Sequence, residues 1–144
     1  MKKAISPVIA TVIIVAVTIA IAIAVALWMT GLVGSFTATE NLQIITAYAE
    51  QFTNTTTNTT YWTITLQVKN VGTTDVTIDN IFINGKPYGS VGVTLNITLP
   101  YSIKTGETKG LTITISSGFS SGQMVEVKLH TASGKEYPKQ VTLP

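Results

Sequence analysis

The sequence predicts an α+β protein in which a long hydrophobic N-terminal α-helix precedes an all-β, immunoglobulin-like sandwich of about seven strands. Residues 5–33 contain no charged side chain and no Asn or Gln, so they form one continuous apolar segment. After Thr37 the composition changes to short segments rich in Thr, Val and Ile, in which apolar and polar residues alternate. Turn signals separate these segments at intervals of roughly 8–14 residues, which is typical of a sandwich.

The apolar segment is long enough to cross a membrane, because at about 1.5 Å per residue it spans roughly 40 Å. Ser6 is a suitable N-cap and Pro7 suits the first helical position, so we expect the helix to begin there. Lys2 and Lys3 precede it and the next charge is Glu40, which places the N-terminus in the cytoplasm. We therefore expect a leader at 1–4, an assembly or transmembrane helix at 5–35 and an extracellular domain at 36–144.

Small residues follow one side of this helix. Ala16, Ala20 and Ala24 repeat at intervals of four, which lets a neighbouring apolar helix approach closely. The alternative is a plain anchor rich in Ala, since Ala is also the best helix former. Gly31 and Gly34 follow, and we expect them to act as a hinge or as a C-terminal stop.

The β-domain is predicted from alternation and turns. A bulge is expected near Asn80, where the alternation changes phase, and Asn84-Gly85 is the strongest hairpin signal. A polar loop is expected at 53–60. The expected strands are 42–50, 62–68, 76–83, 93–99, 111–115, 125–129 and 137–143.

The composition argues against catalysis and against metal or nucleic-acid binding. The chain has no Cys, and its only histidine, His130, shares a predicted strand face with Glu126 and Lys128, so a zinc site lacks ligands. No G-x-S-x-G, S-x-x-K or glycine-rich phosphate loop occurs. Positive charges are scattered and none is Arg. We expect a protein that is not an enzyme and has no cofactor.

Three triplets match the N-glycosylation acceptor pattern Asn-x-Thr, and they begin at Asn54, Asn58 and Asn96. Two of them share one polar loop on the side expected to face outwards, and Asn96 alternates with Leu95 and Ile97, so it can face solvent. The alternative is that Thr is abundant because it suits strands and that the triplets stay unmodified. The chain also has only seven carboxylate side chains and one histidine, so we expect it to tolerate acid.

The start of the chain, KKA followed by ISPVIATVIIVAVTIAIAIAVALW, closely resembles archaeal type IV pilins. Their N-terminal segment carries a short basic leader, an S-P-V-I box and a long hydrophobic helix. The resemblance implies that a class III signal peptidase cuts between Ala4 and Ile5. It also implies that the helices leave the membrane and bundle into a filament core with the β-domains outside, through a pilus assembly ATPase and membrane platform.

Together these features predict the structural subunit of an adhesive pilus, a glycosylated homopolymer that contacts cell or abiotic surfaces. Two alternatives stay open. An archaellin would share the assembly route, although archaellins usually have a G-I-G-T-like box where this chain has SPVIAT. A monomeric membrane-anchored binding domain would use the same helix only as a tether.

Overall fold

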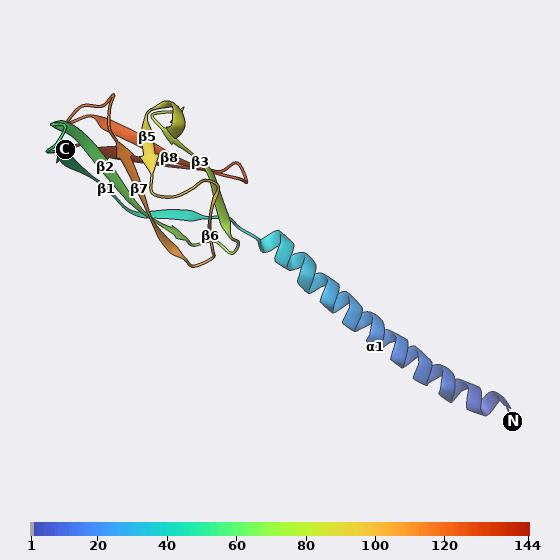
Figure 1. Ribbon diagram of the computed structural model, residues 1–144. Helices are drawn as coiled ribbons and strands as arrows, with labels where there is room; N and C mark the ends of the chain where they lie inside the picture. Colours follow the sequence, from blue (N-terminus) through green and yellow to red (C-terminus); the bar gives the residue numbers. More distant parts are fainter. Residues whose placement is uncertain (1) are drawn as a thin grey trace. The chain divides into compact units, whose positions relative to one another are not determined.

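The computed structural model describes the backbone of residues 2–144 and the side chains of residues 6–144. It confirms a long N-terminal helix followed by two antiparallel sheets (Figure 1). The chain divides into two compact units, and the second runs from Thr39 to Pro144. Each unit is described by itself below.

The first unit contains the helix α1, Lys2–Thr37, which at 36 residues is about 54 Å long. The expected start at Ser6 is wrong, because the helix begins four residues earlier. Pro7 lacks one backbone donor. Because Pro7 lies near the end of the helix, the loss of that one hydrogen bond is tolerated. A stop at Gly31 or Gly34 is also wrong, since both have helical backbone and the helix continues to Thr37. Met1 of the predicted leader lies outside the described residues.

The second unit contains nine strands in two sheets, in the order β1-β2-β7-β5 and β4-β3-β8-β9, with β6 paired to β3. The seven predicted strands are all present, and β4 and β6 are two short additions of two and three residues. The strand bounds are β1 Leu42–Asn54, β2 Thr59–Asn70, β3 Val76–Ile83, β4 Lys86–Pro87, β5 Val93–Leu95, β6 Tyr101–Ile103, β7 Thr108–Ile115, β8 Met124–Thr131 and β9 Glu136–Thr142. A short 3₁₀ helix, Tyr88–Ser90, precedes β5.

The inward-facing residues of both sheets form one apolar core, because alternation turns every second side chain towards the opposite sheet. The predicted bulge in β3 is confirmed by a register shift between Ile78 and Asn80. The hairpin at Asn84-Gly85 is confirmed too, with both residues at positive φ. The largest wholly buried side chains are Ile64, Leu66, Ile78, Ile81, Ile83, Ile103, Leu111, Ile113, Ile115, Leu129 and Leu143.

Two strand limits differ from prediction. β1 and β2 continue through half of the expected polar loop, so that Asn54 pairs with Thr59 and only four residues form the turn. By contrast, β5 is shorter than predicted, since it ends at Leu95 instead of Leu99. There the Asn96 side chain replaces a strand partner, since its Oδ1 accepts from the Thr112 N–H at 2.8 Å and its Nδ2 donates to the Gly110 carbonyl at 3.4 Å.

Candidate assembly surface

The surface of α1 is apolar on every side. One helical stretch, Ser6–Thr37, is long and apolar enough to cross a membrane, and none of its most apolar part is buried within the chain. Apart from Leu32, which is half-buried, the described side chains of this stretch are exposed. A helix that is hydrophobic all round requires an apolar environment, in lipid or among other helices. The core of the second unit is formed by side chains of its own strands.

Five hydroxyl groups on α1 donate hydrogen bonds to carbonyl groups of the same helix. Thr11 Oγ1 donates to the Pro7 carbonyl at 2.7 Å, and Thr18 Oγ1 donates to the Ile14 carbonyl at 2.6 Å. The same i to i−4 bond recurs from Thr30, Ser35 and Thr37. Such bonds remove the cost of placing hydroxyls in a medium without water. These hydroxyls therefore do not require solvent.

The structure places the predicted packing residues Ala16, Ala20 and Ala24 along one exposed side of α1. Gly31 and Gly34 lie further along the helix, and a Cβ added at either position would meet nothing within 4 Å. A packing role for the Ala residues and a hinge role for the Gly residues remain predictions. Ala4 and Ile5, the predicted cleavage pair, have helical backbone, and their side chains lie outside the described residues.

The segment that leads into β1 is held against the sandwich by hydrogen bonds from the turn after β2. The Thr39 carbonyl accepts from the Thr73 N–H at 2.8 Å, and the Asn41 carbonyl accepts from the N–H groups of Val71 and Gly72 at 2.9 and 3.2 Å. We call residues 39–41 the entry segment. Lys135 Nζ also donates to the Glu40 carbonyl at 2.7 Å. Hydrogen bonds from the sandwich thus fix the backbone of the entry segment, which begins two residues after the end of α1.

Gly72 makes this contact possible. A Cβ at this position would lie 2.3 Å from the Thr39 carbonyl oxygen and 2.7 Å from the Asn41 nitrogen. The turn itself is fixed by Asn70, which is wholly buried, and whose Nδ2 donates to the carbonyls of Thr74 and Ile103 at 2.8 and 3.0 Å. No signal in the neighbouring sequence predicts this close approach, because it depends on residues about thirty positions away.

The three predicted glycosylation residues are all exposed, yet their surroundings differ. Asn54 ends β1 and Asn58 lies in the following turn with φ 51°, so the hairpin tip holds both. Asn96 is held against the edge of β7 by the two side-chain hydrogen bonds described above. The strand predicted around Asn96 has already ended, although the residue faces solvent as expected.

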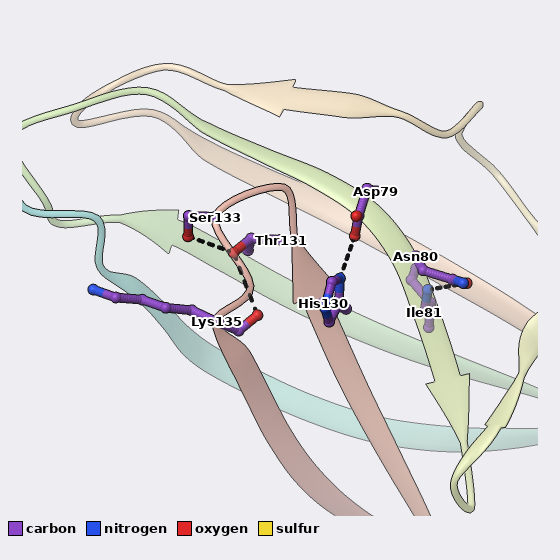
Figure 2. Close-up of polar contacts among 7 residues, drawn as sticks. All are labelled: Asp79, Asn80, Ile81, His130, Thr131, Ser133 and Lys135. Atoms are coloured by element: carbon purple, nitrogen blue, oxygen red, sulfur yellow. Dashed lines mark hydrogen bonds and ion pairs between the residues drawn. The ribbon is translucent and has the colours of Figure 1, made fainter.

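His130 lies on the outer face of β8, with Glu126 and Lys128, as predicted. It is half-exposed, and its Nδ1 lies 2.5 Å from an Asp79 carboxylate oxygen on β3 (Figure 2). The rings of His130 and Phe82 pack edge to face. Among residues 6–144, no group of three or more His, Asp or Glu side chains could hold a metal ion, and no pocket is found in this part of the chain.

The lowered pKa of Glu107 predicts how stability responds to acid. Lys109 Nζ lies 2.8 Å from Glu107 Oε1, and the Lys104 N–H donates to Oε2 at 3.0 Å, which together hold the pKa of Glu107 below its ordinary 4.5. The stability that this adds is present above the unfolded pKa and is lost as pH falls through the lower folded pKa. We expect a thermal midpoint that is nearly constant from pH 7 to about pH 5 and falls below about pH 4.

Thermal unfolding of the full chain in detergent micelles, followed by circular dichroism, measures this profile. Glu107→Gln should lower the midpoint slightly at pH 7 and match the parent near pH 2, and Lys109→Met breaks the same pair from its other side. A steep loss of stability between pH 7 and pH 5 would contradict the expected acid tolerance.

Comparisons with known proteins find similar solved structures but no matching family model or curated sequence. A solved structure, the archaellum periplasmic stator protein FlaG from Sulfolobus acidocaldarius, is similar with a TM-score of 0.47 and 22% sequence identity. The alignment covers 71% of this chain and 99% of that one.

Proposed function

We propose that the chain is the structural subunit of an archaeal type IV adhesive pilus, polymerising through α1 with its β-domain on the filament surface. The observation that carries this proposal is a helix that is apolar on every side and whose most apolar part is exposed among residues 6–144. The N-terminal SPVI segment, with its basic leader, supports the same class of protein.

The length of α1 favours assembly over simple anchoring. A membrane span needs about 20 residues, whereas the apolar stretch Ser6–Thr37 has 32. In a filament surrounded by water, burial of these side chains stabilises the bundle by about 25 cal/mol per Å² of apolar surface, a contribution nearly absent between helices in lipid. Identical subunits that join head to tail without closing a ring form a helical polymer.

The proposed route begins with the precursor in the membrane and its N-terminus in the cytoplasm. A class III signal peptidase cuts between Ala4 and Ile5, and an assembly ATPase with its membrane platform extracts the helix. The β-domain then coats an extracellular filament that adheres to cells or abiotic surfaces. In this proposal the chain has no enzymatic activity and uses no cofactor.

Two other functions use the same helix differently. An archaellin-like subunit would also polymerise, while a monomeric membrane-anchored binding domain would leave α1 in lipid. Electron microscopy of unlabelled material sheared from cells separates assembly from tethering. Filaments that disappear when Lys3 or Ala4 is substituted support leader processing, and the absence of filaments from the unaltered protein would favour the tether.

Replacing Ala20 with leucine tests the predicted packing side. Leucine is at least as apolar, so insertion in the membrane should be unchanged, but its bulk keeps the neighbouring helix away. We expect the yield of sheared filaments to fall roughly tenfold, corresponding to about 1.4 kcal/mol lost per contact. Ile21→Leu is the control, because it changes shape without adding volume. Equal filament yields from Ala20→Leu and the parent would contradict a packing role.

A further inference from the structure

A pair of aromatic rings lies beside one of the three glycosylation triplets, at the tip of the β1–β2 hairpin. Phe52 and Tyr61 face each other in register on the two strands. Their ring centroids are 5.6 Å apart with an interplanar angle of 20°, so the rings are stacked. Phe52 is nevertheless 42% exposed, although it is a large apolar side chain. We call Phe52 and Tyr61 the aromatic platform.

Asn54 lies next to this platform. It follows Phe52 by two positions in the same strand, so both side chains project from the same face of the sheet. Its Oδ1 accepts from the N–H groups of Thr56 and Thr57 at 3.0 and 3.4 Å, which fixes the side-chain amide against the turn. Its Nδ2 makes no hydrogen bond among the described residues. The nitrogen that would carry a sugar is therefore oriented and unoccupied.

The other two triplets do not combine a free side-chain nitrogen with a following turn. Asn96 uses both amide atoms at the edge of β7, so modification there must compete with the sheet. Thr59 and Thr60, which complete the Asn58 triplet, are already paired with Asn54 and Thr53 in the strand ladder. After Asn54 the next two residues of the triplet lie in a turn, where a transferase can reach them, whereas after Asn58 they lie in β2.

We propose that Asn54 is the preferred glycan acceptor of this chain and that its first sugar packs on the aromatic platform. Pyranose rings present a face of C–H bonds, and such a face is attracted to the electron-rich face of an aromatic ring. The site would thus take a pyranose and use it to cover the exposed part of Phe52. The inference rests on the proposed location of the β-domain outside the membrane.

The transfer requires a lipid-linked oligosaccharide as donor and a separate transferase. The bond between the sugar C1 and the phosphate oxygen breaks, and the lipid phosphate leaves with its electron pair. A new bond forms between C1 and Asn54 Nδ2, which loses one proton to a base of the transferase. The amide keeps its second hydrogen, and its Oδ1 keeps both contacts with the turn.

The experiment uses the full chain, folded in detergent micelles, with a single-subunit oligosaccharyltransferase and a lipid-linked oligosaccharide. Peptide mass spectrometry follows the occupancy of the three Asn residues with time. We expect Asn54 to be modified at least tenfold faster than Asn58 or Asn96. Equal or faster modification of either of those residues, or none at Asn54, would overturn the proposal.

A second measurement tests the packing of the sugar. The glycan at Asn54 should raise the thermal midpoint by about 4 °C in the parent, and by less than half of that in Phe52→Thr. Tyr48→Thr is the matched control, since Tyr48 is an exposed aromatic on the same face but lies six residues from Asn54. An equal gain in Phe52→Thr and the parent would show that the sugar does not pack on the aromatic platform. Filament formation is scored separately and without glycan, so a failure here is distinct from a failure of the proposed function.

Discussion

Gly72→Ala is expected to lower the free energy of unfolding of the β-domain by about 3 kcal/mol. The added methyl group would lie 2.3 Å from the Thr39 carbonyl oxygen, a backbone atom that cannot rotate away as a flexible side chain would. The entry segment must move, which breaks the hydrogen bonds from Thr73, Val71 and Gly72 to the carbonyls of residues 39 and 41. Denaturant unfolding of the full chain in micelles measures the loss.

The matched control is Gly110→Ala, since a Cβ there meets nothing within 4 Å and Gly110 lies inside β7. Alanine restricts the unfolded chain more than glycine does, so this variant should be neutral or slightly more stable. Fluorescence of Trp62, which is buried and donates to the Pro144 carbonyl at 3.1 Å, reports the transition in a Trp28→Phe background. Equal stability of the two variants would contradict the close contact of the entry segment.

Ile19→Asp is expected to abolish filaments and to reduce membrane insertion strongly. An aspartate near the centre of a spanning helix costs about 3 kcal/mol on insertion scales, against a favourable contribution from isoleucine. Within a helical bundle the same carboxylate would be buried without a partner, because no positive side chain is present between Ser6 and Thr37. Fractionation of membranes and electron microscopy of sheared material measure the two effects.

Ile19→Leu keeps the hydropathy and serves as the control, with filaments and membrane content expected at parental levels. If Ile19→Asp still gave normal filaments, α1 could not form their core. If it lost filaments but stayed fully in the membrane, assembly and insertion would have different requirements at this position. The second result would assign residue 19 to the helix-to-helix contact.

Local patterns were sufficient to predict the elements whose burial is regular. The strict alternation of Ile64, Leu66 and Val68 in β2 places these residues in the core, and the structure leaves them with no exposed surface. The same holds for β7 and β8. The apolar segment at the N-terminus could be identified as one helix, because its length excludes an isolated strand.

Non-local contacts explain what the patterns missed. The polar residues 53–60 suggest a loop by composition, but backbone pairing across the hairpin continues to Asn54 and Thr59 without requiring apolar side chains. β5 ends early because the Asn96 side chain bonds to β7, and β6 forms where residues 101–103 pair with β3. None of these contacts has a signature within a few residues of sequence.

For the candidate sites, too, local sequence predicted some features, while others depend on contacts between distant segments. The Asn-x-Thr triplets could be found by inspection, but their relative availability depends on hydrogen bonds between segments, as at Asn96 and Thr112. The contact between Phe52 and Tyr61 joins two strands and was not predicted. A triplet preceded by an aromatic residue two positions earlier is the signal that could have identified Asn54.

The pairing of β1 with β2 has a mechanical consequence. The chain passes from α1 through residues 38–41 into one end of β1, whose register with β2 extends from Leu42 and Asn70 to Asn54 and Thr59. A pull applied along β1 from that end loads the ladder in shear, so the interstrand hydrogen bonds share the force instead of breaking one after another. The hairpin can therefore bear tension directed along β1, with the bonds at residues 39–41 taking the load first.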